Sequence, residues 1–192
     1  MKIKTQLRPG ILIIAVLVAG TPILGDDLDT RVATVLKATP LIDGHNDLPW
    51  QYLRRVNNHL SQLDLASDLT QIDNPTDTDL PRLRRGMVGG LFWSVYVPIE
   101  AYGGNPSAVQ AVINQIDFVK RLVNHYDSDL ELALDASSIR RIHASGKIAS
   151  LIGMEGGHSI NNSLASLRQL YDLGARYMTL THSKGLLWAD SA

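Results

Sequence analysis

Hydrophobic positions along the chain alternate between short β-rich runs and longer stretches with helical spacing. The runs predicted to be strands are residues 40–43, 90–97, 130–134, 148–153 and 176–181. The stretches predicted to be helices are residues 107–123, 137–145 and 163–173. Strands that alternate with helices are typical of parallel βα units, not of helical bundles or β-sandwiches. The pattern therefore predicts an α/β fold.

Residues at the ends of the predicted helices are of types that commonly begin or end helices. Ser107 is the predicted N-cap of the longest helix, and Gly146 and Gly174 follow the ends of the other two. Apolar residues at helical spacing predict buried faces, and they are Val109, Val112, Ile113, Ile116, Val119 and Val123 in the first helix and Leu164, Leu167 and Leu170 in the last. The polar, proline-containing stretch from about residue 63 to 85 is predicted to be a loop.

The first 25 residues have the composition of a secretory signal peptide. Lys2, Lys4 and Arg8 precede an apolar run at residues 11–19, and small residues follow it. A membrane span needs about 20 apolar residues, whereas Pro22 closes this run early. The pattern favours a cleaved signal over a permanent anchor and leaves a mildly acidic domain at residues 26–192.

Charge and cysteine content narrow the classes of function. The chain has 18 Lys and Arg against 19 Asp and Glu, without a basic block, so nucleic acid is not an expected partner. It has no cysteine, which excludes disulfides, thiol catalysis and zinc–cysteine sites. Asn161 begins a sequon for N-glycosylation, a weak signal because such triplets are common by chance.

Polar residues capable of catalysis or metal binding follow three of the predicted strands. They are His45 with Asp47, then Glu155, then His182. In a βα barrel, the carboxyl ends of the strands carry the catalytic groups. Loops also begin at strand ends, so the position alone does not distinguish a catalytic residue from an ordinary polar one.

Alternation along an extended segment puts His45 and Asp47 on one side, where both could bind a single cation. The competing interpretation is an Asx-type turn beside a surface histidine. Glu155 lies next to glycines that allow a sharp turn, so its carboxylate could point into a cavity and bridge two metal ions. Its competing interpretation is a solvated loop residue.

The other histidines differ in their sequence context. A rigid strand before His182 could hold its imidazole where it donates to a developing oxyanion or contacts substrate, although it could equally be an ordinary hydrogen-bonded histidine. His158 is predicted to be structural, as a helix cap or a partner of a backbone group. His59, His125 and His143 are poor candidates for metal ligands because they lie away from strand ends.

Three segments of the chain resemble the membrane (renal) dipeptidase family of zinc peptidases. They are Leu-Ile-Asp-Gly-His-Asn-Asp-Leu-Pro at residues 41–49, Gly-Met-Val-Gly-Gly-Leu-Phe-Trp-Ser-Val-Tyr-Val-Pro at 86–98, and the long stretch 149–190 with Glu-Gly-Gly-His-Ser-Ile and Thr-Leu-Thr-His-Ser. The resemblance implies the N-terminal part of a TIM-like (β/α)8 metallo-hydrolase barrel, incomplete in this chain.

The resemblance also implies roles for the candidate residues. His45 and Asp47 would ligate one zinc ion, Glu155 would bridge two zinc ions, and His182 would contact the substrate carbonyl and steady the tetrahedral intermediate. The implied reaction is zinc-dependent hydrolysis of dipeptides by a metal-bound hydroxide at a binuclear site. Family substrates include dipeptides of the cysteinylglycine type, and some members open the β-lactam ring of carbapenems. Ligands of the Asp, Glu and His types also suit manganese or cobalt.

Two departures from the family pattern are evident. Family members pair two cysteines, whereas this chain has Ile99 or Glu100 at one position and Lys184 at the other. The resemblance implies two further histidine ligands and a substrate-binding Arg and Asp in strands beyond Ala192. We therefore expect these 192 residues alone to be poorly stable and inactive, as part of a larger enzyme.

Further expectations concern location and alternative functions. The resemblance implies the secretory pathway, a GPI-anchored full-length protein at the cell surface, and a homodimer. One alternative is a catalytically inactive truncated secreted isoform that acts as a metal-binding or interaction module. Another is a metal-dependent amidohydrolase or sugar deacetylase on a similar barrel, although such enzymes usually begin with an H-x-H pair and this chain has His45 and Asp47.

Overall fold

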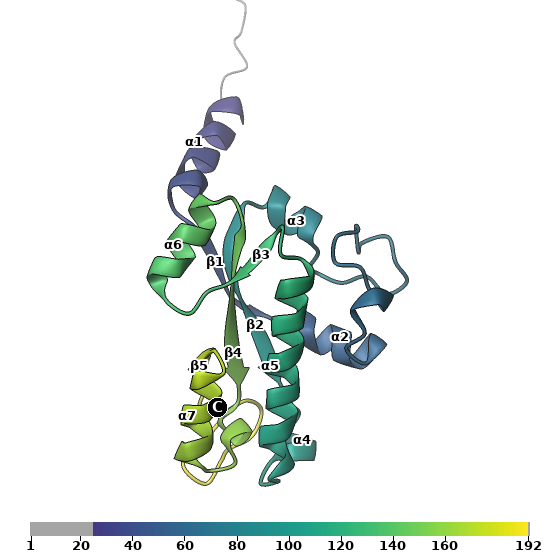
Figure 1. Ribbon diagram of the computed structural model, residues 1–192, viewed down its shortest axis with the longest axis vertical. Helices are drawn as coiled ribbons and strands as arrows, with labels where there is room; N and C mark the ends of the chain where they lie inside the picture. Colours follow the sequence, from purple (N-terminus) through teal and green to yellow (C-terminus); the bar gives the residue numbers. More distant parts are fainter. Residues whose placement is uncertain (1–24, 192) are drawn as a thin grey trace, which may run out of the picture.

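The computed structural model describes residues 25–191, which form a parallel β-sheet flanked by helices (Figure 1). The strands are β1 (Leu41–Asn46), β2 (Val88–Tyr96), β3 (Leu130–Leu132), β4 (Ile148–Glu155) and β5 (Ala175–Met178). Every pairing between them is parallel, which confirms the predicted α/β class. The predicted signal peptide, residues 1–25, lies outside the described residues apart from Gly25.

The order of the strands is not their order in the sequence. β1 pairs with β2, and β2 pairs directly with β4. β3 pairs with residues 148–150 of β4, and β5 pairs with residues 152–154 of the same strand. Because β3 is only three residues long, β4 has room for both short strands along one edge while β2 occupies the other. The carboxyl ends of β1, β2 and β4 therefore lie next to one another.

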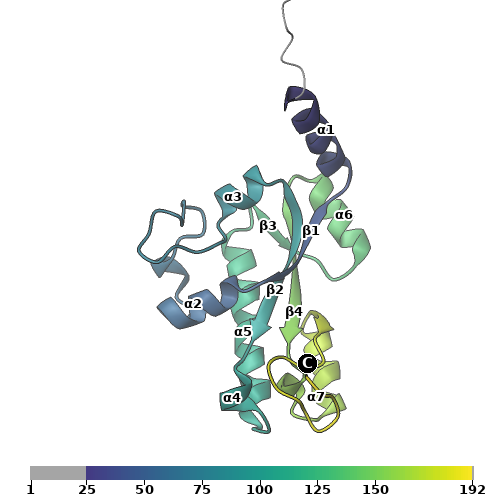
Figure 2. The same cartoon turned by 180° about the vertical axis from the view of Figure 1, so that it is seen from behind.

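Helices connect the strands and cover the sheet. They are α1 (Gly25–Ala38), α2 (Leu48–Val56), α3 (Leu80–Arg85), α4 (Ile99–Tyr102), α5 (Ser107–His125), α6 (Ala136–Ala144) and α7 (Leu164–Asp172), with 3₁₀ turns η1 (Leu60–Gln62) and η2 (Gly157–Ile160). Figures 1 and 2 show α1 extending away from one end of the body, whereas α4 and α7 lie at the other end. None of the helices in the described part of the chain combines the length and apolarity of a membrane span.

The core lies between the sheet and the helices α2 and α5. Trp93 in β2 is fully buried, as are Val112 and Ile116 in α5. Tyr52 of α2 packs against Phe118 of α5 with ring centroids 5.0 Å apart. Burial of this apolar surface is the main favourable contribution to folding, and it fixes β2, the strand beside the candidate site.

Two apolar residues that were predicted to be buried are exposed in the structure. Ile113 is 40% exposed, because the buried face of α5 also includes Gln115, Phe118 and Leu122 and Ile113 lies at its margin. Leu164 is 65% exposed because it is the first residue of α7, where the helix begins at the surface. Periodicity locates a helix face, but tertiary contacts decide which flanking residues it buries.

Several predicted boundaries also differ from the structure. Ser107 is the first residue of α5 and not its N-cap, a position that Pro106 occupies. The predicted 63–85 loop contains α3, which Asp79 caps by accepting from the backbone N–H of Arg82. The predicted strand at 176–181 ends at Met178, although Thr179 still donates its backbone N–H to the Met154 carbonyl of β4. β1 and β4, in contrast, extend beyond their predicted ends as far as Asn46 and Glu155.

Candidate metal and substrate site

The ends of β1 and β4 bring three of the sequence-predicted residues together. His45 Nε2 lies 3.2 Å from Asp47 Oδ1 and 3.5 Å from Glu155 Oε1. One ligand atom from each residue lies within 4.8 Å of the others. The strand order explains this proximity, because Tyr96 of β2 pairs with Glu155 while β1 pairs with the other edge of β2. The cluster can hold a cation between one imidazole and two carboxylates.

Local hydrogen bonds shape the turn that carries His45 and Asp47. The Asp43 carboxylate accepts from the backbone N–H of His45 at 3.1 Å and from Asn46 Nδ2 at 3.1 Å. Asn46 Oδ1 in turn accepts from the N–H of Leu48 at the start of α2. An Asx-type contact and an exposed histidine are therefore present, as the competing interpretation expected, yet the same turn also points His45 and Asp47 at Glu155.

Glu155 is the last residue of β4, and its side chain is only 16% exposed. The competing interpretation of Glu155 as a solvated loop residue is therefore wrong. Ser94 Oγ donates to Glu155 Oε2 at 3.1 Å. The next residue, Gly156, adopts a positive φ of 99° and donates its N–H to Thr179 Oγ1 at 2.7 Å. Ser94 therefore holds Oε2 of the carboxylate and Thr179 anchors the backbone just after it, while Oε1 faces the cluster.

His182 reaches the same carboxylate from a loop and not directly from a strand end. Its Nε2 lies 3.4 Å from Glu155 Oε1. Its ring packs against Tyr96 with centroids 4.9 Å apart, and Tyr96 in turn meets Trp50 edge-on at 5.0 Å. Since β5 ends four residues earlier, at Met178, this aromatic row and not a rigid strand positions the imidazole.

Two tyrosines beside the cluster were missed from the sequence. Burial, with the negative charges of Glu155 and Asp47, raises the pKa of Tyr177 to about 12. Burial also raises the pKa of Tyr96, helped by Glu100 and Glu155. Both phenols therefore remain neutral hydrogen-bonding groups near neutral pH. Alternation along β2 could have revealed Ser94 and Tyr96, because every second residue of a strand faces the same side.

The remaining histidines lie outside the cluster. His158 is 3% exposed and its Nε2 lies 2.7 Å from the Val97 carbonyl, which confirms the predicted bond to a backbone group. His143 Nε2 lies 3.2 Å from the Lys37 carbonyl. Between residues 25 and 191, no other trio of potential ligands meets the same distance criterion. Asn161, the predicted glycosylation site, is half-buried and ends η2 in the left-handed region, with φ 47°.

An ion pair joins helix α4 to the loop after β5, at the two places where the family resemblance implies a cysteine pair. Lys184 Nζ lies 3.5 Å from Glu100 Oε1, and both side chains are more than half exposed. Ser183 Oγ also approaches the same carboxylate oxygen, at 3.5 Å. Solvent screens such exposed pairs, so this contact restrains α4 and the loop far less than a covalent bond would.

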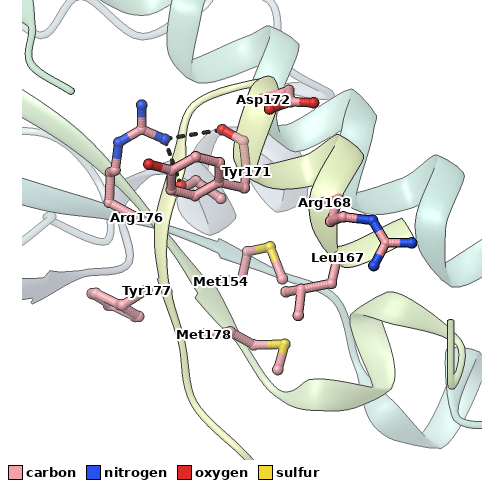
Figure 3. Close-up of a pocket in the computed structure, with 9 residues that line it drawn as sticks. Met154, Leu167, Arg168, Tyr171, Asp172, Arg176, Tyr177 and Met178 are labelled. Atoms are coloured by element: carbon pink, nitrogen blue, oxygen red, sulfur yellow. Dashed lines mark hydrogen bonds between the residues drawn. The ribbon is translucent and has the colours of Figure 1, made fainter. Parts of the chain in front are cut away.

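Two hollows in the described part of the chain differ in character, and only the smaller is lined by residues of the cluster. The smaller, about 270 Å³, lies beside His45 and Asp47 and is lined mainly by polar groups, among them Gln51 and Arg55. The larger, about 570 Å³, is apolar and lies between β4, β5 and α7, where Met154 and Met178 face Leu167 (Figure 3). The larger hollow lacks the convergent ligands of the cluster, so the candidate chemistry lies at the smaller one.

Comparison with solved structures shows the same fold in metallopeptidases. Dipeptidase AC, a metallopeptidase of family M19, is 22% identical to this chain, with a TM-score of 0.63. The match covers 77% of this chain and 44% of the dipeptidase. A metallopeptidase from Rhodobacter sphaeroides, solved with a phosphinate mimic of the dipeptide L-Ala-D-Ala, is 24% identical, with a TM-score of 0.56. The match covers 77% of this chain and 48% of that metallopeptidase.

A third structure, the probable dipeptidase PvdM from Pseudomonas aeruginosa, is 19% identical, with a TM-score of 0.64. The match covers 86% of this chain and 40% of PvdM. The chain thus spans less than half the length of each of these proteins. The family model described as membrane dipeptidase (peptidase family M19) matches residues 29–192. A match over most of the chain, together with the shared fold, shows that this chain belongs to the membrane dipeptidase family, M19.

Proposed function

We propose that the chain supplies the His45–Asp47–Glu155 side of a binuclear zinc site in an enzyme that hydrolyses dipeptides. The observation that carries the proposal is the convergence of one imidazole and two carboxylates within 4.8 Å at the ends of β1 and β4. Family membership supports the reaction class. In this proposal His45 and Asp47 bind one ion, and Glu155 bridges it to a second.

The donor set fits a divalent cation. Two carboxylates and an imidazole bring their ligand atoms to one point, and a cation between them would offset the repulsion between the carboxylates. Zinc accepts nitrogen and oxygen ligands of these types. Oε1 of Glu155 faces both His45 and His182 while Ser94 donates to Oε2, so Oε1 is the atom that two ions could share.

The residues of this chain have separate tasks in the proposed reaction. When bound, the metal ions activate water and polarise the peptide carbonyl. His182 is placed to donate from its imidazole to the carbonyl oxygen as negative charge develops there. Tyr96 and Trp50 form an apolar wall beside His182 that can orient the side chains of a dipeptide. The wall also limits the access of bulk water to the reacting atoms.

The proposal also includes a location for the protein, the secretory pathway. The basic and apolar pattern of the first 25 residues supports entry into the secretory pathway. An extracellular dipeptidase would act on short peptides outside the cell. Secretion of a fusion of these residues to a reporter protein tests this step, and retention of the reporter in the cytosol would contradict it.

Metal titration tests the site directly. The chain is titrated with Zn²⁺ by calorimetry, alongside its His45→Gln and Glu155→Gln variants. We expect either substitution to weaken binding at least 100-fold, because each removes a ligand. His125→Gln is the matched control, since His125 lies at the end of α5, outside the cluster. Equal affinity in all four proteins would overturn the assignment.

Activity is tested on the protein that contains this chain. We expect dipeptide hydrolysis that a chelator abolishes, that added Zn²⁺ restores and that Glu155→Gln removes. Zinc binding without hydrolysis of any dipeptide would instead favour the metal-binding module.

A further inference from the structure

The hydroxyl of Tyr177 lies between two groups on a different strand. It is 3.2 Å from His45 Nδ1 and 3.1 Å from the carbonyl oxygen of Gly44. Tyr177 belongs to β5, whereas His45 and Gly44 belong to β1. The phenol therefore crosses the sheet from β5 to reach the back of the imidazole, on the side away from Asp47 and Glu155.

A glycine in β4 leaves the space that the ring of Tyr177 occupies. Tyr177 pairs with Gly153 of β4, and a Cβ atom at Gly153 would lie 2.1 Å from Tyr177 Cζ. Only glycine leaves space for the ring at that position. On its far side the ring packs against Phe92 of β2, with centroids 4.9 Å apart and planes inclined by 43°. The orientation of the phenol is therefore fixed by three strands.

The hydrogen-bonding capacities of these groups select one arrangement of protons. A phenol has one proton to donate, and a backbone carbonyl can only accept. If Tyr177 donates to Gly44, its oxygen lone pair is left to accept a proton from His45 Nδ1. A neutral imidazole protonated at Nδ1 carries its lone pair on Nε2. That is the atom that faces Asp47 and Glu155.

We propose that Tyr177 is a positioning residue, which holds His45 in the tautomer with the proton on Nδ1 and so presents Nε2 as a metal ligand. In metal sites this task commonly falls to a carboxylate, backbone carbonyl or water beside the ligating histidine. Here the Gly44 carbonyl acts through the phenol of Tyr177. The importance of this arrangement for zinc rests on the proposed function, whereas the effect on the tautomer does not.

Tyr177→Phe tests the inference because it removes the hydroxyl and keeps the ring in its space above Gly153. Nitrogen-15 NMR of the metal-free chain, at a pH well above the usual imidazole pKa of about 6.5, measures the protonation of each ring nitrogen of His45. Without the hydroxyl, Nε2–H can donate to the carboxylates of Asp47 and Glu155. We therefore expect the fraction of His45 protonated at Nδ1 to fall in the variant.

Zinc titration gives the second readout. We expect Tyr177→Phe to weaken Zn²⁺ binding by roughly 10- to 100-fold, the usual effect of losing a partner of a metal-bound histidine. Tyr171→Phe is the matched control: its side chain is 57% exposed on α7, and its ring packs on Arg176, away from the cluster. Thermal unfolding of both variants shows whether the fold is retained.

The outcomes separate the two proposals. Unchanged tautomer and unchanged zinc affinity in Tyr177→Phe overturn the role of Tyr177, even if the wild-type chain binds zinc. A shifted tautomer in a chain that binds no zinc supports that role and overturns the proposed metal site. If the variant does not fold, the wild-type chain decides, because absence of a proton on His45 Nδ1 in the zinc-loaded protein contradicts the inference.

Discussion

Ser94 Oγ donates a hydrogen bond to Oε2 of Glu155 across 3.1 Å, and both residues come from the neighbouring strands β2 and β4. Ser94 is completely buried, whereas the other oxygen of Glu155 faces His45 and His182. The serine thus distinguishes the two carboxylate oxygens. One is fixed in the sheet and the other is presented to the candidate metal.

Ser94→Ala should weaken zinc binding by about tenfold, because the carboxylate loses the bond that fixes its orientation. Calorimetric titration with Zn²⁺ measures the change. Ser150→Ala is the control: Ser150 is buried in the same sheet, but its Oγ has no hydrogen-bond partner. Its replacement should leave zinc affinity unchanged, with stability unchanged or raised. Equal affinities in the two variants would contradict the role of Ser94.

Gly156→Ala should destabilise the protein far more than Gly146→Ala. Both glycines have positive φ, 99° and 83°, and alanine in that region costs about 1 kcal/mol. A Cβ at Gly146 meets nothing within 4 Å, whereas one at Gly156 would lie 2.5 Å from His158 Nδ1. Chemical denaturation measures the two losses, and similar values would show that the segment after Glu155 rearranges easily.

Asp79→Ala should lower the free energy of unfolding by about 3 kcal/mol, because it removes the N-cap of α3 and leaves three N–H donors without their buried acceptor. The Asp79 side chain is fully buried and accepts from the Arg82 backbone N–H, Arg82 Nε and the N–H of Leu69. Asp117→Ala, which removes an exposed pair with Arg121, should cost less than about 0.5 kcal/mol. Equal losses in urea denaturation would contradict this assignment.

Acid should weaken α6 through its N-cap. Hydrogen bonds from the backbone N–H of Ser138 and from Ser137 lower the pKa of Asp135 from 3.8 to about 2. Since the folded pKa is the lower one, the stabilisation is present above pH 3.8 and is lost as the pH falls towards 2. Asp135→Asn should retain the cap but abolish this part of the acid dependence.

Thermal unfolding across that pH range checks the prediction. Asp135→Ala should melt a few degrees lower than the wild type near neutral pH, because alanine cannot cap the helix. If the stability of the wild-type protein and of the Asp135→Asn variant falls equally with acid, a group other than Asp135 controls that dependence.

The sequence determined the local features of this protein. Apolar runs and helical spacing predicted a parallel α/β fold, because side-chain periodicity reports directly on which face of an element is buried. The spacing of His45 and Asp47 predicted that both face one side, and they do, although Asp47 lies beyond the extended segment as the N-cap of α2. The glycines after Glu155 predicted a sharp turn, which Gly156 makes with its positive φ.

The tertiary structure decided which distant residues meet. Nothing in the local pattern specifies that β2 pairs directly with β4, with β3 on the opposite edge of β4, yet that order brings Glu155 to His45. His182 lies beyond its strand and is placed by its packing against Tyr96. Tyr177 reaches His45 only because Gly153 leaves space between them. Such contacts depend on strand order and on the volume of neighbouring side chains, which residue spacing within one segment does not encode.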